Sequence, residues 1–254
     1  CSTFGQTNYR TFDGKLYDFD GGCSYNLVSD LCQEQTKEKC VNRICRRGLV
    51  IYLGHSQHKI VLETNENGTV SATTDTQSLD IPTTIYSHGI EKISGNVIVK
   101  GPYFVLVWNT EETINIEIGP EWKNKTIGLC GNCNGDQTDE FTNEFETLPS
   151  AQAFGNSIAA VGCDSTPPKA KCQPSTTDKL ICNLITKITL NCAKTFDTTL
   201  YIAQCLENLC KCEKPIDCFC NIAEALLREC GGIDNPVFSE KCPKKCPGNQ
   251  VYSS

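Results

Sequence analysis

Nineteen cysteines in a chain of 254 residues constrain its fold more than any other feature. A cytosolic protein does not keep so many thiols, whereas a secreted protein uses them as disulfide cross-links. Zinc is the competing interpretation, but the chain has three histidines and no paired CxxC framework. The sequence therefore predicts an oxidised, extracellular protein. Because the count is odd, at least one cysteine is expected to be free, bonded to another chain, or bonded to a partner beyond residue 254.

Charge and hydropathy argue against two further classes of protein. The formal net charge is -7 and the sequence pI is about 5.1, whereas nucleic-acid binding needs clustered Lys and Arg. No apolar run is long enough to cross a bilayer, and a chain without methionine that starts at Cys1 is expected of a processed or excised fragment. We expect neither a nucleic-acid partner nor a transmembrane segment. Two Asn-x-Thr triplets predict exposed glycosylation sites at Asn67 and Asn124.

Alternating apolar segments fill most of residues 1–163. Each is bounded by Gly, Asn, Ser or Thr: GLVIYLG, HKIVLE, NVIVKG, YFVLVW and TINIEIG. Such segments predict strands, and no helix of convincing period interrupts them, so an antiparallel sandwich or barrel is expected. Tyr52, Tyr103 and Trp108 lie in strand patterns and are expected in the core. The segment 151–163, AQAFGNSIAAVGC, predicts a short helix.

The cysteine content and the spacing of apolar residues change from Cys172 onward. Eleven cysteines fall within 75 residues, and apolar residues take helical spacing in DKLICNLITKI, LYIAQCLENLC and CNIAEALLREC. This predicts a small disulfide-rich α-helical module at 164–235, joined by a linker rich in Pro, Ser and Thr. The final segment, 236–254, is expected to open a third module that stops before its bridges close.

Residues 128–141, GLCGNCNGDQTDEF, combine two cysteines with closely spaced oxygen-bearing side chains. Asn132, Asn134 and Asp136 alternate along the chain, Gly135 permits a sharp turn, and two acids follow at Asp139 and Glu140. Hard oxygen ligands at this density suit Ca²⁺. The competing interpretation is an acidic loop exposed to solvent. We predict a calcium loop that differs from the helix-loop-helix type, because no acid closes it at the twelfth position.

These features together resemble the von Willebrand factor type D assembly of secreted mucins, von Willebrand factor, tectorins and zonadhesin-like proteins. The similar segments cover essentially the whole chain. They are Cys1, YRTFDG from Tyr9, FDGGCSYNL from Phe19 and GLCGN from Gly128 in the first module, and Cys182, Cys192, Cys205, Cys210, Cys212, Cys218, Cys220 and Cys230 in an eight-cysteine module. CPKKCPGN from Cys242 resembles the start of a trypsin-inhibitor-like module.

The resemblance implies a set of metal ligands and disulfides. Asp13, distant in sequence, is expected to join the side chains of the loop, with Asp136 giving its main-chain oxygen. The implied bridges are Cys1 to Cys130, Cys23 to Cys163, and Cys40 to Cys45. Some relatives have a cysteine three residues before Cys130 that pairs with the equivalent of Cys32. This chain has Ile127 there, so we expect Cys133 to substitute.

The leading functional hypothesis is a non-catalytic, calcium-stabilised module of a secreted glycoprotein that assembles with like modules into polymers, gels or matrix. Cys172, Cys218 and Cys246 are candidates for a bond to another chain. The alternative is a binding module that captures another extracellular protein or a glycan without polymerising. Catalysis is not expected, because the chain lacks the nucleophile, metalloprotease and phosphate-loop motifs.

Overall fold

The computed structural model divides the chain into two compact units, Cys1–Lys169 and Ala170–Ser254. The described residues are 1–5, 7–30, 39–41, 44–46, 48–53, 58–64, 69–93, 95–109, 113–143, 145–160, 172–190, 192, 198–210, 212, 214–231 and 235–243, with the backbone alone at 30, 39–41 and 44–46. The sequence predicted boundaries after residues 163 and 235. The helix at Pro236–Lys241 lies within the second unit, where it packs against the helix at Pro215–Glu229.

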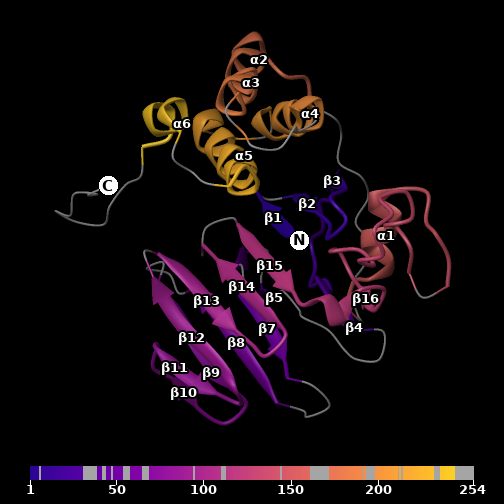
Figure 1. Cartoon of the computed structure of the whole chain (residues 1–254), viewed down its shortest axis with the longest axis vertical. Coiled ribbons are helices and arrows are strands. Elements are labelled where there is room, and N and C mark those ends of the chain that lie inside the picture. The colour runs from indigo at the N-terminus through magenta and orange to yellow at the C-terminus, as the bar shows by residue number, and fades with distance from the viewer. Residues whose placement is uncertain are drawn as a thin grey trace. The chain divides into compact units, whose positions relative to one another are not determined.

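The first unit is built from antiparallel strands (Figure 1). Its largest sheet has the order β11-β12-β13-β14-β15-β1-β2-β3. The strands are β11 (Thr83–Ile85), β12 (His88–Ile93), β13 (Asn96–Lys100), β14 (Phe104–Trp108), β15 (Ile114–Ile118), β1 (Ser2–Phe4), β2 (Asn8–Arg10) and β3 (Leu16–Asp18). The first strand of the chain therefore lies inside the sheet, between β15 and β2, with Ser2 opposite Asn115.

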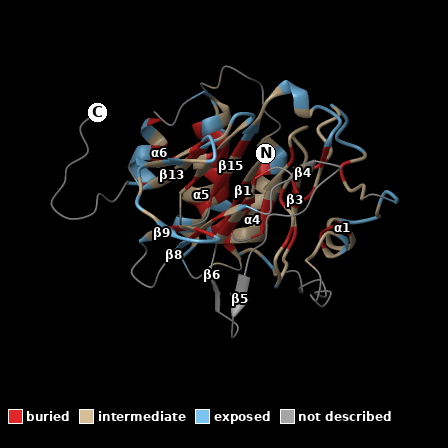
Figure 2. Cartoon of the chain, turned by 90° about the horizontal axis from the view of Figure 1, so that it is seen from below, coloured by how far each residue is buried: buried red, intermediate tan, exposed pale blue. Residues whose placement is uncertain are grey.

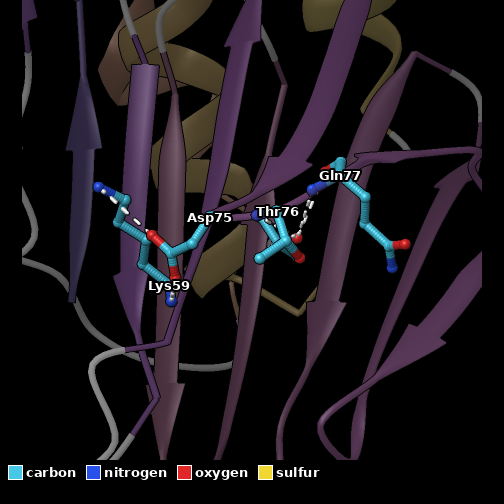
Figure 3. Close-up of polar contacts among 5 residues, drawn as sticks. Lys59, Asp75, Thr76 and Gln77 are labelled. Atoms are coloured by element: carbon cyan, nitrogen blue, oxygen red, sulfur yellow. Dashed lines mark hydrogen bonds and ion pairs between the residues drawn. The ribbon is translucent and has the colours of Figure 1, made fainter.

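A second sheet has the order β10-β9-β8-β7. It is made of β10 (Ser78–Leu79), β9 (Val70–Thr74), β8 (Lys59–Thr64) and β7 (Gly48–Tyr52). Figure 3 shows how polar side chains close its turns: the Asp75 carboxylate accepts from the Lys59 amide at 3.1 Å, and the Thr74 hydroxyl accepts from the amides of Thr76 and Gln77. Two short ladders complete the unit, β4 (Ser29–Asp30) with β16 (Thr126–Ile127) and β5 (Lys39–Val41) with β6 (Ile44–Arg46).

The two main sheets share one apolar core. Alternate residues of each strand point into it, including Ile60 and Leu62 of β8 and Val97 and Val99 of β13, all fully buried. Figure 2 shows buried residues, in red, along strands of this unit such as β15 and β1. The fold class predicted from alternation, a mainly β sandwich followed by a helical disulfide-rich module, is confirmed. The prediction for Tyr103 is wrong, because it lies in the turn before β14 and is 58% exposed, whereas Trp108 is buried.

Short helices make up the remainder. A 3-10 turn, η1 (Pro120–Trp122), precedes β16, and α1 (Ala151–Ser157) ends the first unit within the predicted helix 151–163. The second unit contains α2 (Thr176–Cys182), α3 (Leu184–Ile188), α4 (Thr198–Leu209), α5 (Pro215–Glu229) and α6 (Pro236–Lys241). None of the helices in the described part of the chain is long and apolar enough to cross a bilayer.

Among its described residues, the second unit contains five disulfides, which connect its helices and the segments around them. Cys182 of α2 is bonded to Cys205 of α4. The other four bridges are Cys172–Cys210, Cys192–Cys230, Cys212–Cys218 and Cys220–Cys242. Two of the eight expected module cysteines, Cys210 and Cys220, are therefore bonded to cysteines outside that set. Helix α2 also has a capping box, in which the Ser175 hydroxyl accepts from the Asp178 amide at 3.1 Å and the Asp178 carboxylate accepts from the Ser175 amide at 2.7 Å.

Candidate metal centre

The loop at 128–141 is fixed at its start by backbone contacts and a disulfide. Gly128 has φ +133°, and a Cβ on it would lie 2.6 Å from the Leu27 carbonyl oxygen. The amide of Leu129 donates to Asn26 O at 2.9 Å, and that of Cys130 to Leu27 O at 2.8 Å. Cys130 is bonded to Cys1, across 129 residues of sequence, as the family resemblance implied. The loop therefore starts from a rigid base in the core of the first unit.

The hairpin between β2 and β3 brings Asp13 to this loop. The amide of Phe12 donates to Cys130 O at 2.9 Å, which places the tip of the hairpin beside the loop. One Asp13 carboxylate oxygen accepts from the Asn134 amide at 2.9 Å. The Gln137 side chain donates to Asp13 O at 2.7 Å, and the Lys15 ammonium donates to Gln137 O at 3.0 Å. The structure thus gathers Asp13 with residues more than a hundred positions away.

Glu140 is the most buried acid of the group, with 1% of its surface exposed. Its Oε2 accepts from the Asn132 amide at 3.1 Å, whereas Oε1 has no hydrogen-bond partner among the described residues. Burial raises the pKa of Glu140; the Thr11 hydroxyl and the Asn132 amide partly oppose this, and the charges of Asp13 and Asp139 add to it. An ionised carboxylate in this position lacks part of the solvation it would have in water.

Gly131 makes room for that carboxylate. Its φ is +82°, and a Cβ built on it would lie 2.6 Å from Cδ of Glu140. Any residue with a side chain would therefore displace Glu140 or strain the backbone. Gly131 was not among the residues predicted for the site, although the sequence shows a glycine directly after Cys130.

The remaining predicted ligands differ in what they contact. Asp139 accepts from the side-chain amides of Asn132 at 3.1 Å and Asn134 at 2.8 Å. Asp136 is exposed, and its carboxylate accepts from the amide of Thr138 at 2.8 Å and from its hydroxyl at 2.7 Å, which lowers the pKa of Asp136. Oδ1 of Asp136 therefore closes its own turn.

The residues of the loop fit a cation that prefers oxygen ligands. Their carboxylates alone would not be enough to hold it. Within the described ranges, no three His, Cys, Asp or Glu side chains are close enough to hold a metal ion by themselves. The side-chain amides of Asn132 and Asn134 lie among the carboxylates: each donates from Nδ2 to Asp139, and their Oδ1 atoms accept from the main-chain amides of Asn134 and Asp136. Mixed carboxylate, amide and main-chain oxygens are the usual environment of Ca²⁺. The orphaned, buried Oε1 of Glu140 is the observation that points to a cation here.

Cys133 carries a free thiol, so the predicted bridge to Cys32 is not formed in the structure. Cys133 adopts φ +54° within the loop, and its carbonyl oxygen accepts from the Asn124 amide at 2.9 Å. Burial raises the pKa of its thiol, and the charge of Asp13 raises it further. Cys32 lies outside the described residues. The same is true of Cys163, the expected partner of Cys23, which is itself disulfide-bonded.

Two of the three candidates for a bond to another chain are wrong. Cys172 is bonded to Cys210 and Cys218 to Cys212, because the fold of the helical unit brings each pair together. The third candidate, Cys246, lies outside the described residues. Cys40 and Cys45 are opposite one another in the β5–β6 ladder, although their side chains are not described.

The two predicted glycosylation sites can be placed only in part. Asn124 is exposed, as expected of an acceptor, in the segment between η1 and β16. Asn67 lies outside the described residues.

Comparison with known proteins agrees with this arrangement. Residues 1–146 match the model of the von Willebrand factor type D domain, and residues 181–247 match that of the C8 domain. Mouse mucin-2 is 34% identical over 271 residues, human mucin-19 is 28% identical over 271, and mouse otogelin-like protein is 27% identical over 287. The alignments include 99%, 97% and 99% of this chain but 6%, 3% and 12% of those relatives. The chain belongs to the family of proteins built from von Willebrand factor type D and C8 domains.

Proposed function

We propose that the chain is a non-catalytic, calcium-stabilised module of a secreted glycoprotein that mediates self-assembly into extracellular polymers, gels or matrix. Family membership and the density of disulfides support a structural role outside the cell. The calcium part rests on one observation, the buried Glu140 carboxylate with an unpartnered oxygen beside two further acids.

The physical argument for calcium is electrostatic. Asp13, Asp139 and Glu140 repel one another, and Glu140 is removed from water. A divalent cation offsets both effects, and hard oxygen donors favour Ca²⁺ over metals that prefer sulfur or nitrogen. The residues that would hold it are those predicted from sequence: Asp13, Asn132, Asn134, Asp139, Glu140 and the main chain of Asp136. The bound ion would link the β2–β3 hairpin to the loop and so add to the free energy of unfolding.

The calcium proposal is tested with the chain freed of metal by a chelator. We expect added Ca²⁺ to raise the free energy of unfolding of the first unit, by about 2.7 kcal/mol at a hundred times the dissociation constant. Glu140→Gln is expected to remove this response, whereas the exposed control Glu121→Gln is expected to keep it. Calorimetric titration measures binding directly.

Comparing the stability of Glu140→Gln with and without metal shows whether Glu140 is a metal ligand or has only a structural role. Without metal, the variant is expected to be at least as stable as the wild type, because a neutral amide replaces a carboxylate whose pKa is raised by burial. With metal, it is expected to be the less stable protein. An equal response to Ca²⁺ in both proteins, or none in the wild type, would contradict the calcium site.

Self-assembly is the second part of the proposal. Cys172 and Cys218 are closed into bridges within the chain, so contacts between modules would be non-covalent, or would use the free thiol of Cys133 or a cysteine outside the described residues, such as Cys246. Sedimentation at rising concentration, with Ca²⁺ and with a chelator, measures non-covalent association. Reducing and non-reducing gels of the full-length parent measure covalent association. A monomer under all of these conditions would overturn assembly.

One feature favours the alternative, capture of another extracellular protein or glycan. Phe145 is 89% exposed on a turn in which the Asn143 side chain accepts from the amides of Phe145 and Glu146, both at 2.9 Å. An aromatic side chain presented by a fixed turn is typical of a binding anchor. Pull-down with the module and with Phe145→Ala separates the two functions. A partner other than the module itself, retained only by the wild type, favours capture, and self-association unaffected by the substitution favours assembly.

A further inference from the structure

The triplet Asn124-Lys125-Thr126 lies across a boundary between surface and core. Asn124 is exposed, with φ +59°, directly after the turn at η1. Thr126 is 2% exposed and belongs to β16, where it is opposite Asp30 of β4. Its hydroxyl donates to Gly131 O at 2.9 Å. The two residues that define an N-glycosylation acceptor are therefore in opposite environments once the chain has folded.

Both residues are needed for the modification. The side-chain amide of the asparagine is the nucleophile, and the transferase recognises the hydroxyl of the third residue. In the folded chain that hydroxyl is buried and bonded to the loop. We propose that Asn124 is an N-glycan acceptor that is used only before residues 124–133 fold, and that its glycan then covers the thiol of Cys133.

The transfer step is a simple substitution. Nδ2 of Asn124 forms a bond to C1 of the first sugar of a lipid-pyrophosphate-linked oligosaccharide. The bond from that carbon to the pyrophosphate oxygen breaks, the lipid pyrophosphate leaves, and the amide nitrogen loses one proton to a base of the transferase. Nothing is oxidised or reduced.

The folded chain accommodates the product. The side chain of Asn124 is exposed, and the contact that anchors the residue is made by its main-chain amide, which donates to Cys133 O at 2.9 Å. Asparagine also tolerates a positive φ better than most residues do. A glycan attached before folding therefore leaves β16 and its contacts intact.

The same backbone bond places the glycan beside Cys133. Cys133 is half-buried, and its thiol is free. A glycan is large compared with a side chain, so it would occupy the approach to this thiol from the side of Asn124. Occupancy of Asn124 would then restrict exchange of Cys133 with thiols and disulfides of other molecules.

The timing is tested by transfer in vitro. The full chain, made without glycans and oxidised, is incubated with oligosaccharyltransferase and a lipid-linked donor, either native or after reduction, alkylation and unfolding. We expect mass spectrometry to find glycan on Asn124 in the unfolded chain and none in the native chain. Modification of the native chain would overturn the timing, and an unmodified unfolded chain would overturn the acceptor.

The shielding is tested on natively folded, secreted protein with a bulky maleimide. We expect Cys133 to react several-fold faster in Asn124→Gln than in the wild type. Wild type whose glycans have been trimmed by an endoglycosidase is expected to react as fast as Asn124→Gln. This control excludes misfolding of the variant as the cause of its faster reaction. Asn67→Gln, which removes the other acceptor, is expected to react like the wild type. Equal rates in wild type and Asn124→Gln, including no reaction in either, would overturn shielding.

Discussion

The two units of the chain are stabilised in different ways. The first unit packs two sheets around a continuous apolar core and uses the Cys1–Cys130 bridge to attach its loop to β1. The second unit has short helices and a smaller set of buried residues, and five bridges connect its segments. A long chain segment can bury enough apolar surface to fold, whereas a small one needs cross-links. One sequence can therefore depend on core packing for the stability of one part and on oxidation for that of another.

Full reduction should give the largest effect and should separate the units. Each bridge of the second unit contributes about 2–4 kcal/mol in the chain-entropy model, so five together contribute about 10–20 kcal/mol, which is comparable to the whole stability of about 5–15 kcal/mol typical of a domain. We expect α4 and α5 to lose protection from hydrogen exchange while β13 and β14 keep theirs. Mass spectrometry of peptides from the intact chain measures both. If α4 and α5 stay protected from hydrogen exchange after complete reduction, the two units do not differ in their dependence on disulfides.

Leu62→Ala should destabilise the first unit alone. Leu62 is fully buried in β8 between the sheets, and such a truncation destabilises by about 2–5 kcal/mol. Denaturant unfolding followed by tryptophan fluorescence measures it, since both tryptophans, Trp108 and Trp122, are in the first unit. Leu200→Ala, at a half-exposed position in α4, is the matched control and should leave this transition unchanged.

Alkaline pH should also act on the first unit. Tyr17 is buried and its hydroxyl donates to Leu129 O. Burial raises its pKa well above the ordinary value, with Tyr9 and Glu140 adding to the effect. A group whose pKa is raised on folding contributes stability below its unfolded pKa, about 10, and loses it as the pH rises further, by about 1.4 kcal/mol per pH unit. Tyr17→Phe should show a shallower loss between pH 9 and 11, measured with thiols blocked. Identical slopes would show that Tyr17 is not the group responsible.

Ser175→Ala should have the smallest effect. Loss of an N-cap hydroxyl destabilises a helix by about 1 kcal/mol. Because Cys182 anchors the other end of α2 to α4, we expect the loss to appear as faster hydrogen exchange at residues 176–180 rather than as unfolding of the unit. Ser239→Ala, at an exposed position inside α6, is the control. A global change after Ser175→Ala would indicate that the bridges do not dominate this unit.

Local sequence patterns predicted the strands and helices better than they predicted the burial of individual side chains. Alternation identified β13, where Val97 and Val99 are buried, and helical spacing identified α4 and α5. The same reasoning failed for Tyr103, because this residue lies in the turn before β14 and not in the strand, and its side chain is exposed. An alternating pattern therefore predicts which side chains are buried only for residues within the strand itself.

The site was predictable in composition but not in burial. The spacing of oxygen donors identified the loop, and the resemblance brought in Asp13. The burial of Glu140 depends on Gly131, which leaves room for its carboxylate, and on the β2–β3 hairpin, which contacts the loop. No local sequence pattern contains this information. Cysteine pairing was likewise open: Cys172 and Cys218 were plausible external links until the helices placed Cys210 and Cys212 beside them, since spacing does not determine connectivity.

The interior position of β1 sets the order in which the first unit can be completed during synthesis. Strand β1 leaves the ribosome before its neighbour β15 and before Cys130, the partner of Cys1, which both lie more than a hundred residues downstream of it. At about 5–20 residues per second, translation leaves this segment waiting for many seconds. The nascent protein must therefore be kept from premature oxidation until residue 130 has entered the same compartment.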